Sequence, residues 1–211
     1  MLLDQDECQL VLIDYQTRLM PAIFENELVI ANAVRLARMA YVLQVPVWGT
    51  AQNPDKLGPN VPEVQSAVEA AGGRTLSKMH FSAMPEGLGE SLRPPVRKAV
   101  TGAPGGGNAR SLPKHLQKPA PEPEEGKNTI VIAGCEAHIC LLQTALDLLE
   151  EEFEVWVVTD ACSSRTERNR DAAFDRLAGA GAELVTTEMV VFEWIRTAEH
   201  PVFKEAQALI K

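Results

Sequence analysis

The sequence lacks a long apolar segment. No run approaches the roughly 18 to 20 apolar residues that a membrane-crossing helix needs. The first ten residues, MLLDQDECQL, are acidic and do not have the basic stretch followed by an apolar one that marks a secretory signal. We therefore expect no membrane partner and a cytoplasmic location, with a mitochondrial one left open.

Cysteines are few and acidic side chains outnumber basic ones. Four cysteines in 211 residues are too few for a disulfide scaffold, so we expect free thiols in a reducing compartment. The formal net charge is -9 and the pI is about 5.0. An acidic chain repels phosphate backbones, which argues against nucleic acid as a general partner.

The remaining composition and its periodicity predict one α/β domain over residues 1–211. Hydrophobic residues make up 45% and charged residues 23%, the balance of a globular protein. Apolar runs predict strands at 9–15, 45–50, 74–78, 129–135, 153–162 and 182–187. Helical spacing or composition predicts helices at 25–43, 61–72, 140–153, 168–181 and 202–211. This alternation predicts a three-layer α/β/α fold with a mostly parallel, six-stranded, doubly wound (Rossmann-like) sheet.

Residues 93–127 interrupt this pattern. The segment holds seven of the 14 prolines and a run of three glycines, and it has no apolar periodicity. Because strands and helices resume after it, we interpret it as an insertion loop within the domain.

Three reactive side chains are predicted at the carboxyl ends of strands, where ligands bind in parallel sheets. Asp14 ends the first strand, Lys78 ends the third, and Cys140 begins the helix after the strand at 129–135. The positive end of a helix dipole and a nearby lysine would both lower the pKa of the thiol. The carboxylate could then exchange a proton with it. Each residue also has an ordinary interpretation. Asp14 could be a turn former or helix cap, Lys78 a solvated surface residue, and Cys140 a small buried side chain.

Four ordered segments resemble blocks of the isochorismatase-like family of cysteine hydrolases. They read VLIDYQTRL, SKMHFSAM, AGCEAHICLLQTALDLLE and VVTDACSSRTERNRDAAFDRLAGAGAELVTTE. With the C-terminal HPVFKEAQALIK, they are most similar to the branch of isochorismatase-domain-containing proteins. The resemblance covers nearly the whole chain outside the insertion.

The resemblance implies a catalytic triad. Asp14 matches the family's acid-base, Lys78 its lysine and Cys140 its nucleophile. It also implies a cis peptide between Cys135 and Glu136, and an oxyanion hole formed by the N–H groups of Glu136 and Cys140.

We expect Tyr15, Gln16 and Phe81 to line the substrate pocket. Nicotinamidases of this superfamily bind a metal through Asp and His residues after the second strand. Here that region, TAQNPDKLGPN, contains Asp55 but no histidine, so we predict no metal and no cofactor.

The alternative to a metal-free site is zinc bound by Cys135, His138 and Cys140. The spacing of these residues matches no familiar zinc motif, so we do not expect it.

The sequence thus predicts a cysteine-dependent hydrolase of small amides or related acyl compounds, acting through a thioester. Two alternatives remain open: a non-catalytic interaction protein on the same fold, and a nucleic-acid-acting protein that uses the basic part of the insertion, residues 93–118. The resemblance also implies a homo-oligomer. Phe192, Trp194 and Ile195 are candidates for the contact between subunits.

Overall fold

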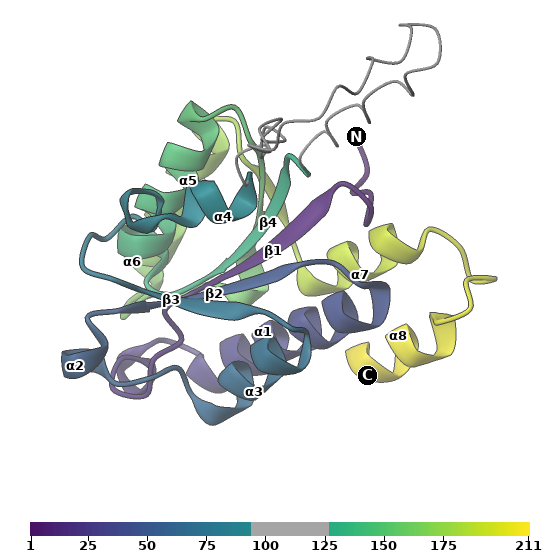
Figure 1. Cartoon of the computed structure of the whole chain (residues 1–211), viewed down its shortest axis with the longest axis horizontal. Coiled ribbons are helices and arrows are strands. Elements are labelled where there is room, and N and C mark those ends of the chain that lie inside the picture. Colours follow the sequence, from purple (N-terminus) through teal and green to yellow (C-terminus); the bar gives the residue numbers. More distant parts are fainter. Residues whose placement is uncertain (94–126) are drawn as a thin grey trace, which may run out of the picture.

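Six parallel strands form one sheet in the part of the chain that the structure, a computed structural model, describes: residues 1–93 and 127–211 (Figure 1). The strands are β1 (Cys8–Ile13), β2 (Val47–Gln52), β3 (Arg74–Lys78), β4 (Thr129–Gly134), β5 (Glu154–Val158) and β6 (Glu183–Val185). Their order is β3-β2-β1-β4-β5-β6, so the chain reverses direction across the sheet between β1 and β4. In doubly wound folds this switch point is where ligands bind.

Helices cover both faces of the sheet. One layer contains α1 (Asn26–Leu43), α3 (Pro62–Ala70), α7 (Thr187–Ile195) and α8 (Phe203–Ile210) (Figure 1). The other contains α4 (Leu88–Leu92), α5 (Leu142–Glu150) and α6 (Glu167–Gly179), while α2 (Pro54–Leu57) is a single turn after β2. The predicted α/β/α architecture is confirmed. None of the described helices is long and apolar enough to cross a membrane.

Burial on both faces explains the continuous apolar runs of the central strands. Every residue of β1 and of β4 is buried, as expected of strands between two helical layers. Gln9 is the polar member of β1, and its side-chain amide donates to the carbonyls of Leu92 and Lys127. Both ends of the predicted insertion 93–127, most of which lies outside the described residues, are therefore held near the start of β1. The predicted catalytic residues lie beyond the opposite ends of the strands.

The last third of the chain differs from the sequence prediction. Helix α7 was not predicted, although its buried residues Val190, Val191, Trp194 and Ile195 lie at helical spacing; Met189 and Phe192 extend them into a nearly continuous apolar run that obscures the period. Trp194 and Ile195 on this helix are each only 2% exposed, and Phe192 packs against Phe203 with ring centroids 6.3 Å apart. The prediction of a subunit contact was therefore wrong for Trp194 and Ile195, because these side chains serve the fold of their own chain, whereas Phe192 is only partly buried and its part in a contact stays a prediction.

Gly134 allows β1 and β4 to approach closely at their carboxyl ends. It pairs with Ile13 and has a φ of 150°. A Cβ atom at this position would lie 2.3 Å from the carbonyl oxygen of Ile13, which no side chain tolerates. The glycine therefore fixes the spacing between β1, which leads to Asp14, and β4, which leads to the turn that contains Cys140.

We predict that Gly134→Ala lowers the free energy of unfolding by about 3 kcal/mol or more, because the backbone of one strand must move. Urea denaturation would measure this loss. Gly179→Ala is the matched control, since a Cβ there meets nothing within 4 Å, and it should change stability by less than about 1 kcal/mol. Equal effects of the two substitutions would contradict this account of the strand spacing.

Candidate active site

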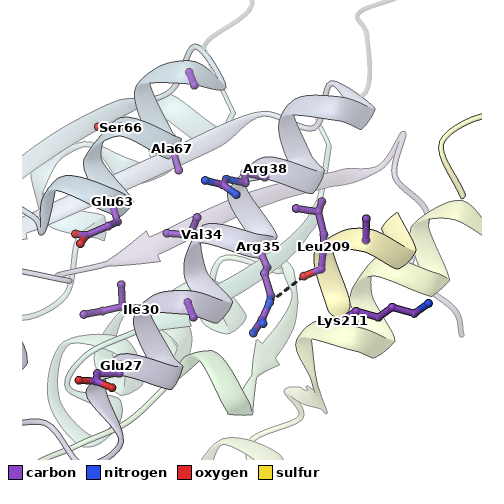
Figure 2. A pocket seen from close by; sticks show the side chains of 13 residues that line it. Glu27, Ile30, Val34, Arg35, Arg38, Glu63, Ser66, Ala67, Leu209 and Lys211 are labelled. Carbon is purple, nitrogen blue, oxygen red and sulfur yellow. Dashed lines mark hydrogen bonds between the residues drawn. The ribbon is translucent and has the colours of Figure 1, made fainter. Parts of the chain in front are cut away.

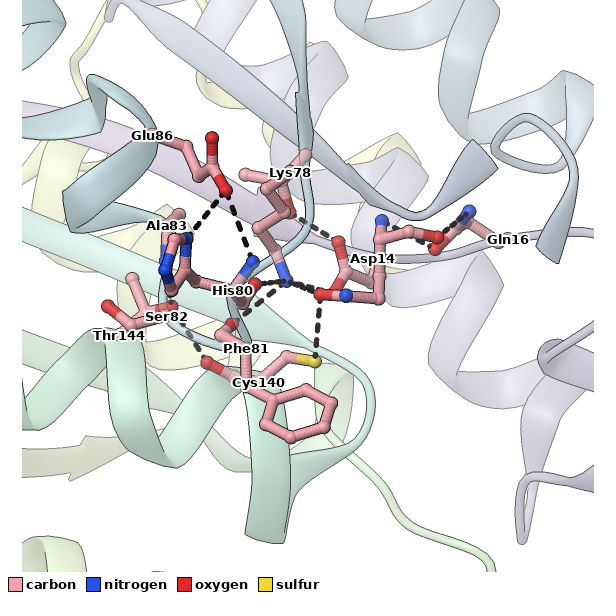
Figure 3. Close-up of polar contacts among 12 residues, drawn as sticks. Asp14, Gln16, Lys78, His80, Phe81, Ser82, Ala83, Glu86, Cys140 and Thr144 are labelled. Carbon is pink, nitrogen blue, oxygen red and sulfur yellow. Dashed lines mark hydrogen bonds and ion pairs between the residues drawn. The ribbon is translucent and has the colours of Figure 1, made fainter. Parts of the chain in front are cut away.

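The structure brings the three predicted catalytic residues together at the carboxyl edge of the sheet (Figure 3). Asp14 follows β1 directly and has a left-handed backbone, with a φ of 53°. Lys78 is the last residue of β3, and Cys140 lies in a π-helical turn, Ala137–Leu141, after β4. A non-glycine residue held at positive φ is a feature that clusters at functional sites.

Asp14 and Lys78 form an ion pair inside the protein. Asp14 Oδ2 lies 2.8 Å from Lys78 Nζ, and both side chains are completely buried. Thr50 Oγ1 donates to the other oxygen, Asp14 Oδ1, at 2.7 Å. A buried ion pair is stable only when further polar groups complete its bonding, because both charges have lost their water.

Gln52 completes the bonding of the lysine, and the sequence analysis missed it. Its Oε1 accepts from Lys78 Nζ at 2.7 Å and lies 4.0 Å from Cys140 Sγ. Its Nε2 donates to the carbonyl of Met79 at 2.7 Å. Gln52 is the last residue of β2, but the apolar pattern predicted that this strand ends at residue 50, so Gln52 did not fall at a predicted strand end.

Gln16 holds Gln52 in place and is not exposed to a pocket. Its Oε1 accepts from the backbone N–H of Gln52 at 2.8 Å, and its Nε2 donates to the carbonyl of Gln52 at 2.9 Å. Tyr15 is also fully buried, with its hydroxyl donating to Ala161 O at 2.6 Å. Of the three residues predicted to line a pocket, only Phe81 is exposed, at 52%. Tyr15 and Gln16 are packed inside the protein because both follow a strand that is buried on both faces.

Access to the cysteine is narrow. Cys140 is 6% exposed, and Asp14 and Lys78 lie behind it in the interior. A cavity of about 690 Å³ lies elsewhere on the molecule, between α1, α3 and α8, and contains none of the three (Figure 2).

The loop after β5 fixes the turn that leads to the cysteine. Ala137 N donates to Ser163 O at 2.7 Å, and Arg165 Nε lies 2.8 Å from Glu136 Oε2. The peptide between Cys135 and Glu136 is cis, as the resemblance implied. Among the described residues, the N–H of Glu136 has no hydrogen-bond acceptor, so it is free to donate to an external oxygen.

Thr144 connects the cysteine turn to the segment that follows Lys78. This fully buried residue of α5 donates from Oγ1 to Cys140 O at 2.7 Å and accepts from Ala83 N at 3.1 Å (Figure 3). The positions of the thiol and of the lysine are therefore coupled through one hydroxyl group.

The thiol is neutral at rest, contrary to the sequence prediction. Burial and then the nearby Asp14 carboxylate raise the pKa of Cys140 to about 12, although Lys78 opposes the shift. Cys140 is the fourth residue of the π-helical turn that runs directly into α5 at Leu142, so it lies in the first turn of a continuous helix, as predicted. The expected lowering by a helix dipole does not outweigh burial.

The described residues contain no group of three His, Cys, Asp or Glu side chains placed to hold a metal ion. The predicted zinc alternative at Cys135, His138 and Cys140 is not such a group. The Nδ1 atom of His138 lies 2.9 Å from Ser164 Oγ instead.

Comparisons with known proteins find relatives that match nearly the whole chain. The family model described as Isochorismatase domain matches residues 111–189. Isochorismatase domain-containing protein 2A of Mus musculus is 35% identical over 202 residues, which cover 96% of this chain and 82% of the relative. Isochorismatase domain-containing protein 2 of Danio rerio is also 35% identical, over 95% of this chain and 85% of the relative.

Solved structures share the fold. The MAR1 ribonuclease of Caenorhabditis elegans has a TM-score of 0.81 and 28% identity, covering 100% of this chain and 92% of that one. The YcaC gene product of Escherichia coli, described as an octameric hydrolase of unknown specificity, has a TM-score of 0.73 and 21% identity. The match covers 99% of this chain and 94% of the E. coli protein.

We predict that the protein loses stability as the pH rises above about 9. Burial raises the pKa of Cys8 to about 11 and that of Cys140 to about 12, and it also raises the pKa of Cys162. The unfolded chain releases these protons near the ordinary value of 9.0, before the folded chain does, so alkali favours unfolding. Urea midpoints at pH 7.5, 9 and 10.5 would show a progressive decrease.

The variant Cys8→Ala/Cys162→Ala is the control for this effect, because it removes two of the buried thiols. Its stability should fall less steeply with pH than that of the wild type. A wild-type midpoint that stays constant from pH 7.5 to 10.5 would contradict the assignment of neutral buried thiols.

Proposed function

The chain belongs to the isochorismatase family, and from this premise we propose that it is a cysteine-dependent hydrolase of small amides or related acyl compounds. The observation that supports the proposal most directly is the buried Asp14–Lys78 ion pair, with the Cys140 thiol in the same cluster. A carboxylate, an ammonium group and a thiol, all withdrawn from water, are the components of nucleophilic acyl transfer.

Asp14 is the base that removes the thiol proton. Its Oδ2 forms the ion pair with Lys78 Nζ at 2.8 Å. The same ammonium group also donates to Gln52 Oε1 at 2.7 Å and to Phe81 O at 2.9 Å. Because each carboxylate oxygen has two lone pairs, Asp14 Oδ2 can accept a proton while Lys78 stays beside it. The thiol keeps its own proton until a substrate is attacked, which also limits side reactions.

The reaction then follows in two steps. The sulfur of Cys140 bonds to the carbonyl carbon as Asp14 takes its proton, and the developing oxyanion accepts from the N–H groups of Glu136 and Cys140. The C–N bond breaks, and the amine leaves with the proton from Asp14. Water, deprotonated by Asp14, cleaves the thioester and restores the thiol, so that amide and water give acid and amine.

Lys78 remains an ammonium group throughout. Its charge stabilises the Asp14 carboxylate and favours the thiolate over the thiol. Gln52 orients the lysine and contacts the sulfur from the side of β2. No step requires a metal or a cofactor, and the partner is a small molecule.

A homo-oligomer is part of the same proposal. It is supported by the octameric description of the E. coli relative, which shares the fold. The four free and buried cysteines are consistent with a reducing, cytoplasmic environment.

RNA cleavage is a second candidate, and the similarity to a C. elegans protein described as a ribonuclease favours it. The described site gives it less support than amide hydrolysis. Histidine is the most common acid-base group, yet no imidazole hydrogen-bonds to Asp14, Lys78 or Cys140 among the described residues. The net charge of -9 also disfavours a phosphate backbone.

We predict that a panel of small amides and acyl compounds contains a substrate whose hydrolysis depends on Cys140. Cys140→Ala should reduce kcat/KM by at least about 1,000-fold, since it removes the nucleophile. The matched control is Cys8→Ala, at the opposite end of β1, which should retain most of the activity. The same proteins are incubated with RNA.

Two results would contradict this proposal. Hydrolysis that persists in Cys140→Ala would exclude the thioester route. RNA cleavage by the wild type that Cys140→Ala abolishes, without turnover of any acyl compound, would favour the second candidate.

A further inference from the structure

The turn Met79–Phe81 holds the catalytic lysine by its backbone. The carbonyl oxygens of His80 and Phe81 accept from Lys78 Nζ at 3.3 and 2.9 Å (Figure 3). The carbonyl of Met79 accepts from Gln52 Nε2 at 2.7 Å. Three consecutive carbonyl groups therefore orient the lysine or the glutamine that contacts it. The geometry of the site depends on how firmly this exposed turn is fixed.

Glu86 fixes the turn from its outer side. A single oxygen, Glu86 Oε1, accepts from Met79 N at 2.9 Å, from His80 N at 3.1 Å, and lies 2.8 Å from His80 Nδ1. Figure 3 shows the carboxylate across the turn from Lys78. An exposed ion pair alone has little effect. Here, however, two of the three contacts are to backbone N–H groups, which set the direction of the peptide planes.

One peptide group transmits this constraint to the site. The peptide between Met79 and His80 donates from its N–H to Glu86 and accepts at its C=O from Gln52. It is therefore held at both ends, on one side by the glutamate and on the other by a residue that contacts Lys78 and Cys140. If the first contact were lost, the peptide could rotate, and the bonds to Gln52 and Lys78 would weaken together.

We propose that Glu86 is a positioning residue that holds Lys78 and Gln52 in place through the backbone of the turn Met79–Phe81. This inference rests on the proposed role of Lys78 in the hydrolase, but the contacts that carry it do not depend on any substrate. Hydrogen bonds from the N–H of Met79, then from His80, lower the pKa of Glu86 to about 2. The carboxylate thus remains ionised at any working pH, and the anchor is permanent.

The test is the pH dependence of iodoacetamide alkylation at Cys140, followed by mass spectrometry of the peptide. Lys78 lowers the pKa of this thiol, so a displaced lysine should move the alkylation profile to higher pH. We expect Glu86→Ala to move it by about one pH unit, which makes alkylation about tenfold slower at pH 9. Glu86→Asp, which withdraws the carboxylate from the turn, should move it in the same direction.

Two further variants separate positioning from a general structural effect. Glu86→Gln keeps an oxygen that can accept from both backbone N–H groups, so its alkylation rate should stay within about threefold of the wild type. Glu90→Ala removes an exposed carboxylate from the neighbouring helix α4 and should match the wild type. Thermal unfolding shows for each variant that the protein is folded.

The proposal is overturned if folded Glu86→Ala or Glu86→Asp alkylates Cys140 with the wild-type pH profile. It is also overturned if alkylation accelerates equally at every pH, since that would show a change in access alone. The assay needs no substrate, so its outcome is independent of whether an amide is hydrolysed. Where a substrate is found, Glu86→Ala should lower kcat with little change in KM.

Discussion

The structure of the site depends on one buried ion pair. Asp14 and Lys78 are withdrawn completely from water, a condition that costs several kcal/mol for each charge unless other groups replace the lost hydration. Thr50, Gln52 and two backbone carbonyls supply those groups. The strand order makes this arrangement possible, because β2 separates β3 from β1 and contributes Thr50 and Gln52 to the space between the two charges. The ion pair in turn determines the electrostatic surroundings of Cys140.

The two charges act on the thiol in opposite directions. Asp14 raises the pKa of Cys140 and Lys78 lowers it, while burial dominates both and keeps the thiol neutral. A neutral nucleophile beside a carboxylate with a free lone pair requires proton transfer during attack rather than before it. A small displacement of the Lys78 ammonium group would change the balance between the two opposite effects on the pKa of Cys140. This explains why the carbonyl groups of the turn Met79–Phe81 hold the ammonium group in place.

Much of the fold and part of the site could be predicted from the sequence. The run over β1 is apolar because both faces are covered, and Asp14, Lys78 and Cys140 could be placed at one edge because parallel strands end there. Helix α7 was missed because Met189 and Phe192 join its buried residues into a nearly continuous apolar run, which obscures the helical spacing of Val190, Val191, Trp194 and Ile195. The raised pKa of the Cys140 thiol could not be predicted either, because it results from burial, and burial depends on packing between segments that are distant in the sequence.

Coupling between Asp14 and Lys78 is the property on which the rest of the account depends. A double-mutant cycle with Asp14→Asn, Lys78→Met and the combined variant measures it through the free energy of unfolding. Each single substitution leaves a buried charge without its partner and should lower the free energy of unfolding by about 3 to 5 kcal/mol. The combined variant should recover part of this loss, with a coupling energy of at least about 2 kcal/mol. Additive losses would show that the two side chains do not act as a pair, and would contradict the account.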